Sequence, residues 1–144
     1  KRHYRVATIK HHHGSFEIDH RGKDTWHHAQ AGADVVIISS PNKLAVIEKL
    51  PEERPLDKII QNIKDVDLII TEGYKKEDKP KIEILRGAVG QELVCQPEEL
   101  LAVVTDVELD VTLPCFGLDE VEEMVDFLEK KILLPAKNFG KRQE

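Results

Sequence analysis

Short apolar runs, each bounded by polar residues, alternate along this chain with segments whose apolar residues recur at helical spacing. Short runs rich in Val, Ile and Leu are typical of β-strands. Two of them, 67–71 and 100–105, are continuous, as expected of strands buried in a parallel sheet. The sequence predicts six strands, at residues 4–9, 34–39, 43–48, 67–71, 81–85 and 100–105.

Three segments with helical spacing lie among these strands. We expect Asp24 to cap the first helix and Gly32 to end it. Asp119 and Glu122 stand in capping-box positions at the start of the last one. The sequence predicts helices at residues 25–31, 55–65 and 118–132.

This order of strands and helices predicts an α/β fold with a mostly parallel sheet. The turn Ser40-Pro41-Asn42 between the second and third strands predicts one antiparallel hairpin. In a chain of 144 residues we expect a single domain over residues 1–134. A polar tail is expected at 135–144.

Charge is distributed unevenly along the chain. Residues 1–28 contain all seven histidines and a net charge of +3, whereas the rest carries −9 of the overall −6. A small cationic end on an acidic body suits a compact anion such as a nucleotide or a pterin phosphate, and argues against general nucleic-acid binding.

Two further features bear on location. No apolar run approaches the roughly 20 residues that span a bilayer, so we expect no membrane partner. Cys95 and Cys115 stand singly and not as a CxxC pair. The sequence therefore predicts a reduced, cytoplasmic protein.

Polar signatures end three of the predicted strands, at residues 10–12, 71–73 and 105–106. The carboxyl ends of parallel strands share one sheet edge, which is where α/β proteins bind ligands. Glu72 could hold Mg²⁺ through water or orient an attacking water there. The alternative is an acid in a turn, with Gly73 supplying a positive φ. Because two other strands are expected to end in polar residues at the same sheet edge, the functional interpretation of Glu72 is favoured.

Asp106 follows Thr105 at the end of a buried strand. A carboxylate there can accept hydrogen bonds from N1–H and N2–H of guanine, whereas adenine offers no such pair of donors. An Asx turn after the strand explains the residue equally well. The sequence leaves these two interpretations open.

The segment Gly22-Lys23-Asp24 is not a phosphate loop. The pattern GxxxxGK[ST] requires glycine at position 17, where this chain has Glu17, and no other segment of the 144 residues fits it. Asp24 could assist Mg²⁺ or cap the following helix, and capping is the favoured single role.

The histidine cluster allows three interpretations. Neutral imidazoles of His11, His13, His27 and His28 could bind Zn²⁺, although adjacent histidines rarely share one ion and no cysteine is near in sequence. Binding of a phosphate or substrate by imidazoles that titrate near neutrality is favoured over this metal site. A solvated loop at residues 11–23 is the third possibility.

Several of these motifs, in register from about residue 4 to 134, together resemble the MobB family of molybdopterin-guanine dinucleotide biosynthesis adapter proteins. Seven short motifs in order are far more specific than any one of them. The segments that carry the resemblance are Val6–His11, Gly22–Asp24, Ala31–Asp34, Asp67–Lys75, Pro80–Ile82, Ala102–Asp106 and Leu113–Phe116.

The resemblance implies a P-loop GTPase-like fold, with helices on both faces of the sheet, that binds GTP and Mg²⁺. It implies weak GTPase activity at most, with Glu72 as the catalytic residue and with Asp24 and Glu72 at the metal. It also implies a homodimer that assists a MobA-like guanylyltransferase and handles molybdopterin or its guanine dinucleotide. The expected nucleotide-binding residues are Lys10, His11, Asp24, Gly73, Thr105 and Asp106.

The chain departs from the family at its start. Family members open with a strand, a GxxxxGK[ST] loop and a helix, and Lys1–Arg5 resembles the end of that helix and the start of the second strand. From the resemblance we expect this first βα unit to lie upstream of Lys1 or to be absent. A second hypothesis is a His-rich metal- or anion-binding module on an α/β scaffold, without nucleotide hydrolysis.

Overall fold

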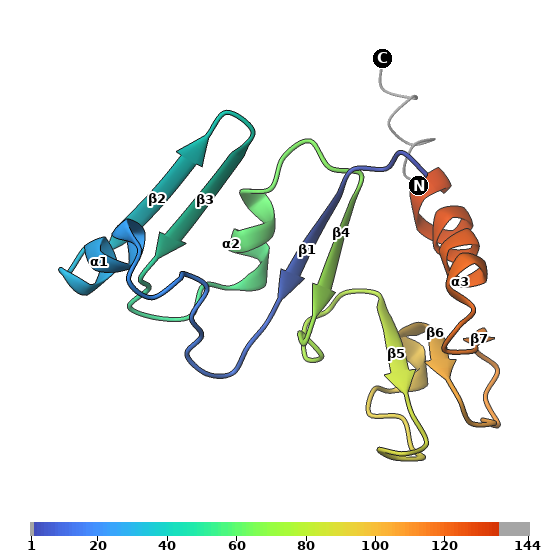
Figure 1. The fold of residues 1–144 in the computed structure, drawn as a ribbon. Helices are drawn as coiled ribbons and strands as arrows, with labels where there is room; N and C mark the ends of the chain where they lie inside the picture. The colour runs from blue at the N-terminus through green and yellow to red at the C-terminus, as the bar shows by residue number, and fades with distance from the viewer. Residues whose placement is uncertain (1, 136–144) are drawn as a thin grey trace.

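The computed structural model describes residues 2–135, which form short strands and helices in alternation (Figure 1). The strands are β1 (Val6–Lys10), β2 (Val35–Ser40), β3 (Lys43–Glu48), β4 (Leu68–Glu72), β5 (Lys81–Leu85), β6 (Leu100–Thr105) and β7 (Cys115–Phe116). The helices are α1 (Asp24–Gln30), α2 (Leu56–Gln61), α3 (Val121–Leu128), the 3₁₀ turn η1 (Pro97–Glu99) and the π-helical turn η2 (Glu129–Leu133), which continues α3.

The strands pair mostly in parallel, as the sequence predicts. β1 pairs with β4, and β6 lies between β5 and β7 in a second parallel sheet. The predicted hairpin is confirmed as the antiparallel pair β2–β3. In the described part of the chain, β4 forms hydrogen bonds with β1 and with no other strand. In the same residues, β5 forms them with β6 alone. The strands therefore form three small sheets and not one.

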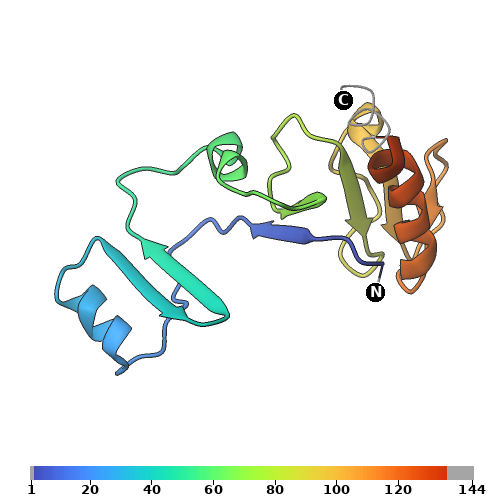
Figure 2. The same ribbon diagram turned by 90° about the horizontal axis from the view of Figure 1, so that it is seen from above.

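Two views show how these sheets are arranged (Figures 1 and 2). The β2–β3 hairpin and α1 lie at one end of the molecule, and β5–β7 with α3 lie at the other. β1 and β4 lie between them, and β1, β4, β5 and β6 all run in the same direction (Figure 1). Their carboxyl ends therefore face the same side.

The core is centred on β6. Ala102 and Val103 are fully buried there, and Val103 packs with Leu85 of β5 and Leu100. Partly buried side chains, including Cys95 and four aliphatic residues, cover this cluster. Burial of β6 on both faces explains its continuous apolar sequence.

Two of the predicted helix starts are wrong. The N-cap of α1 is Lys23 and Asp24 is the first helical residue, with no side-chain cap hydrogen bond. Asp24 therefore contributes only a charge in the first turn, where it complements the helix dipole. Gly32 follows the helix with a φ of +108°, in agreement with its predicted role as a terminator.

Helix α3 begins without the predicted capping box. Its N-cap is Glu120, whose carboxylate accepts a hydrogen bond from the Gly117 N–H at 2.7 Å and so stabilises the preceding turn. The capping box lies instead at η1, where Gln96 and Glu99 are its partners. Helix α2 is also shorter than predicted and ends at Gln61.

One face of the β2–β3 hairpin is apolar and uncovered. Val35 and Ile37 on β2 share this face with Leu44 and Val46 on β3, because Ile37 lies opposite Val46 in the register. These four side chains are between 49% and 64% exposed, whereas on the other face Val36 is buried and Ile38 is 57% exposed. Exposed apolar patches of this kind are typical of surfaces that contact another molecule.

No helix within residues 2–135 combines the length and the apolar character needed to cross a bilayer. Of the predicted polar tail at 135–144, all but the first residue lies outside the described residues.

Candidate functional site

The ends of β1 and β4 meet through a charged pair. Lys10 lies opposite Glu72 in the parallel register, and its Nζ contacts Glu72 Oε1 at 2.6 Å. Both side chains are about two-thirds exposed, at 67% and 71%, so the pair is open to an incoming ligand. Of the three strand ends predicted to share one sheet edge, these two meet, whereas the end of β6 belongs to a separate sheet.

Gly73 fits closely against His11 just beyond this pair. Its φ is +96°, and a Cβ at this position would lie 3.2 Å from both the Cβ and the carbonyl oxygen of His11. The His11 N–H donates to the Glu72 carbonyl at 2.8 Å and extends the parallel ladder by one residue. Gly73 is therefore required by both its conformation and this close approach.

The His11 ring is held on three sides. Its Nε2 contacts Glu53 Oε1 at 2.8 Å, and the ring stacks on Tyr74 at a centroid distance of 4.8 Å. His13 meets it edge-on at 4.6 Å. Burial, and then the nearby carboxylates of Glu53 and Glu77, raises the pKa of Tyr74, so its hydroxyl stays protonated as a donor.

The end of β6 is organised differently. Thr105 is buried, and its Oγ1 accepts a hydrogen bond from the Val107 N–H at 3.1 Å. Asp106 Oδ1 accepts from the Gly87 N–H at 2.7 Å, where a Cβ on Gly87 would clash with Val107. One carboxylate oxygen of Asp106 thus fixes the loop after β5, and among residues 2–135 no hydrogen bond reaches the other.

The predicted site residues fall into three places. Lys10, His11, Glu72 and Gly73 come together at the β1 and β4 ends. Thr105 and Asp106 end β6 in the neighbouring sheet, on the same side of the molecule (Figure 1). Asp24 belongs to α1 at the hairpin end, and within residues 2–135 no hydrogen bond or ion pair joins it to Lys10 or Glu72. Across that same range, no three His, Cys, Asp or Glu side chains converge on a metal-binding geometry.

Sequence reasoning overlooked two contributors to the first group, Glu53 and Tyr74. Tyr74 directly follows Gly73, and an aromatic residue next to a predicted site residue could have indicated its contribution. Glu53 lies in the loop before α2, and its contact with His11 depends on the tertiary fold.

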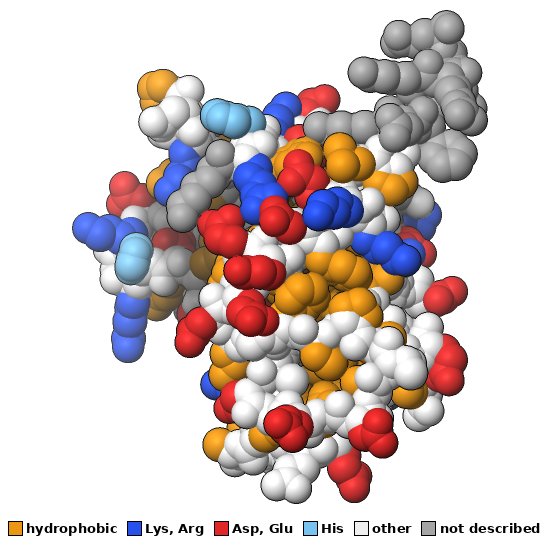
Figure 3. Space-filling view, turned by 90° about the vertical axis from the view of Figure 1, so that its right-hand side faces the viewer, with side chains coloured by type: hydrophobic (Ala, Val, Ile, Leu, Met, Phe, Trp, Pro, Cys, Tyr) orange, Lys and Arg blue, Asp and Glu red, His pale blue; other side chains and the backbone are white. Residues whose placement is uncertain are grey.

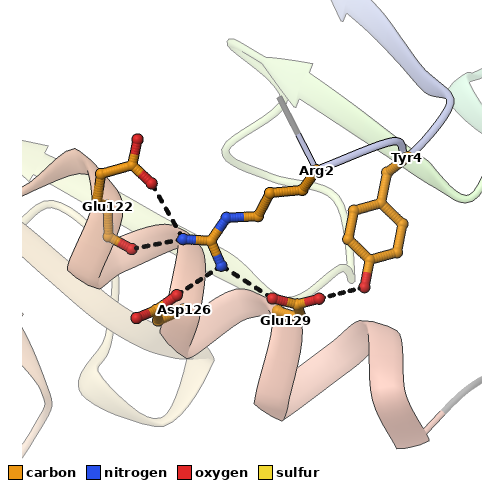
Figure 4. Close-up of polar contacts among 5 residues, drawn as sticks. All are labelled: Arg2, Tyr4, Glu122, Asp126 and Glu129. Atoms are coloured by element: carbon orange, nitrogen blue, oxygen red, sulfur yellow. Dashed lines mark hydrogen bonds and ion pairs between the residues drawn. The ribbon is translucent and has the colours of Figure 1, made fainter.

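A second polar cluster fastens the start of the chain to α3 (Figure 4). The Arg2 guanidinium contacts Glu122 at 3.0 Å and Glu129 at 2.9 Å, and also donates to Asp126. The Tyr4 hydroxyl donates to the other oxygen of Glu129. Acidic side chains (red) with basic ones (blue) among them gather on the α3 side of the molecule (Figure 3).

This cluster predicts an acid-sensitive contribution to stability. The Tyr4 hydroxyl and then Arg2 hold the pKa of Glu129 below its ordinary value. The ionised carboxylate of Glu129 therefore stabilises the folded protein at any pH above the ordinary pKa of a glutamate. That contribution is lost as the pH falls through the lowered pKa. In Glu129→Gln we therefore expect a smaller drop in the urea midpoint between pH 7 and the region below about pH 4.

Glu123→Gln is the matched control, because Glu123 lies on the same helix and Arg2 does not contact it. An equal pH dependence in both variants would contradict the role given to Glu129.

Comparison with known proteins gives a consistent result. The family profile of molybdopterin guanine dinucleotide synthesis protein B, MobB, matches residues 1–106. The molybdopterin-guanine dinucleotide biosynthesis adapter protein of Haemophilus influenzae is 32% identical over 130 residues, which cover 89% of this chain and 73% of that protein. The adapter protein of Escherichia coli K12 is 33% identical over 134 residues, which cover 86% and 74%.

Solved structures agree with these sequence matches. The crystal structure of molybdopterin-guanine biosynthesis protein B superposes with a TM-score of 0.65 at 34% identity, over 88% of this chain and 78% of that one. Bacillus subtilis MobB superposes with a TM-score of 0.66 over 89% and 80%, and at 23% identity this similarity concerns the fold alone.

Proposed function

The chain belongs to the MobB family of molybdopterin-guanine dinucleotide biosynthesis adapter proteins, and we propose that it binds GTP with Mg²⁺ during molybdenum cofactor maturation. Hydrolysis is weak at most, and the protein hands nucleotide or pterin to a partner enzyme. The exposed Lys10–Glu72 pair at the joined ends of β1 and β4 carries this proposal. It offers a carboxylate for the metal and an ammonium group for phosphate at one strand edge.

The 144 residues contain no GxxxxGK[ST] segment. We therefore assign to the described residues the contacts with the base, the metal and the attacking water. Glu72 orients that water or holds Mg²⁺ through water. His11, fixed by Glu53 and Tyr74, closes the site on the side of β1.

Guanine recognition is assigned to Asp106. Its two carboxylate oxygens can accept from the N1–H and N2–H donors of guanine, which adenine lacks, because Oδ1 keeps a second lone pair beside its bond from the Gly87 N–H. Asp106→Asn presents an amide donor in part of that space, so we expect the preference for GTP over ATP to fall about tenfold or more. Parallel titrations of GTP and ATP measure the preference.

Two comparisons separate base recognition from damage to the loop that Asp106 holds. A disordered loop weakens GTP and ATP binding together, whereas a lost base contact weakens GTP alone. Asp110→Asn, in the segment between β6 and β7, is the matched control. Unchanged GTP affinity in Asp106→Asn would refute the assignment.

We further propose a MobA-like guanylyltransferase as the partner, molybdopterin or its guanine dinucleotide as the shared ligand, and a cytoplasmic location. A homodimer is also proposed, and the uncovered face of Val35, Ile37, Leu44 and Val46 supports it. That face is uncharged along most of its length, so a second copy related by a two-fold axis matches it with an identical apolar surface.

A further inference from the structure

The imidazole of His11 is held much more firmly than the carboxylate that it contacts. The ring stacks on Tyr74 at 4.8 Å and meets His13 at 4.6 Å, and the His11 side chain is only 18% exposed. Glu53, whose Oε1 lies 2.8 Å from Nε2, is 71% exposed. Among residues 2–135, Glu53 makes no other ion pair or hydrogen bond. A fixed nitrogen is therefore paired with a carboxylate that can leave.

The cation next to His11 is paired in the same way. Lys10 Nζ lies 2.6 Å from Glu72 Oε1, and these side chains are 67% and 71% exposed. Lys10 and His11 are consecutive residues of an extended segment, so their side chains leave it on opposite faces. An anion that approaches the end of β1 therefore meets a carboxylate on either face.

The two carboxylates differ in what the ligand complex asks of them. In the proposed function Glu72 acts on Mg²⁺, so it keeps a role when the nucleotide is bound. Glu53 lies in the loop at residues 49–55, between β3 and α2, and has no such role. At 2.8 Å from a carboxylate oxygen, Nε2 has to carry a proton, because two lone pairs would repel each other. A phosphate oxygen is a charged acceptor of the same kind.

We propose that Glu53 is an internal competitor, whose carboxylate occupies the anion-binding position on His11 Nε2 until a phosphate group of the ligand displaces it. The inference rests on the proposed function, which supplies that phosphate. Displacement is easy, because an exposed pair of this kind is favoured over its open form by a factor of about five at most. Tyr74 and His13 still hold the ring when Glu53 leaves. The contact thus lowers the apparent affinity without abolishing it.

Removing the competitor should strengthen anion binding. Inorganic pyrophosphate is titrated by calorimetry into the wild type and into Glu53→Ala, without Mg²⁺, so that no metal draws Glu72 away from Lys10. We expect the dissociation constant to be about two- to sixfold lower in Glu53→Ala, because Nε2 is no longer occupied. An unchanged or weaker affinity would mean that Glu53 only fastens its loop to His11, and would overturn the proposal. Absence of pyrophosphate binding in both proteins would overturn it as well.

Glu52→Ala is the matched control. Glu52 is the exposed neighbour of Glu53 in the same loop, and among residues 2–135 no ion pair joins it to His11. The control removes the same charge and so measures the general electrostatic gain for an anion. An equal gain in both variants would contradict the specific role of Glu53.

A double-mutant cycle tests whether His11 is the group in competition. His11→Phe keeps a ring that can stack on Tyr74 and lacks Nε2. In this background, Glu53→Ala should increase the pyrophosphate affinity no more than Glu52→Ala does. The full gain of Glu53→Ala in the absence of the imidazole would contradict competition at His11.

Titration of the same proteins with GTP separates this inference from the proposed function. GTP binding with no gain in Glu53→Ala over Glu52→Ala, for GTP and for pyrophosphate, overturns the competition and leaves the nucleotide site intact. A gain for pyrophosphate without GTP binding in any variant removes the nucleotide site and leaves an anion site at which Glu53 competes.

Discussion

Replacing Glu72 with Gln is expected to lower the rate of GTP hydrolysis about 10²-fold or more, with GTP affinity changed only a few-fold. The substitution keeps the size of the side chain and removes the charge that, in the proposed function, acts on the metal and the attacking water. We propose that the guanine base binds elsewhere, at Asp106, so GTP binding should be largely preserved. Single-turnover hydrolysis and equilibrium titration with GTP measure the two effects separately.

The structure provides controls for this experiment. The Lys10–Glu72 pair is exposed, and such pairs contribute about 0–1 kcal/mol to folding, so the variant stays folded. Glu77→Gln removes a carboxylate from the turn after β4 and should hydrolyse GTP at the wild-type rate. If Glu72→Gln hydrolyses GTP at a rate within twofold of wild type, the catalytic role is contradicted and Glu72 is only a residue of the turn after β4.

Placing a charge on the uncovered hairpin face is expected to convert the proposed homodimer into a monomer. Ile37→Lys sets an ammonium group in the middle of the apolar face, next to Val46. In a two-fold interface each substitution occurs twice, so two like charges are buried near each other without partners. Sedimentation velocity or light scattering over a concentration series measures the shift.

Ala45→Lys is the matched control. Ala45 is exposed on β3, lies opposite Ile38, and belongs to the other face of the same hairpin. It adds the same charge and should leave the dimer intact. If both variants remain dimeric, the interface lies elsewhere and the exposed face has another occupant.

Much of the fold follows from local sequence signals. Strands β1 to β6 were predictable because each carries its own apolar run, and the hairpin was predictable because Pro41 and Asn42 mark a short turn. β7 was missed because two residues are too few to show a period. The division into three sheets was missed for a different reason, since an apolar run indicates a strand but not which edges of that strand are paired.

The candidate site was predictable to the extent that strand register determines it. Lys10 and Glu72 meet because each occupies the last position of one of two paired parallel strands. The positive φ of Gly73 was likewise indicated by its place after a strand. The hydrogen bond from the Gly87 N–H to Asp106 could not be predicted, because it depends on how two loops pack. Neither residue carries a local sequence signal for it.

The polar cluster in which Arg2 and Tyr4 contact Glu122, Asp126 and Glu129 also has a consequence for the order in which the chain folds. Its contacts join residues that are 120 to 127 positions apart, and closing a chain of that length costs about 4 kcal/mol of configurational entropy. A few partly exposed ion pairs do not supply that, so they form only after the sheets have brought the two ends together. Docking of α3 onto Arg2 and Tyr4 is thus a late event. Because Tyr4 leads directly into β1, α3 and the first strand are expected to open as one unit in native-state hydrogen exchange.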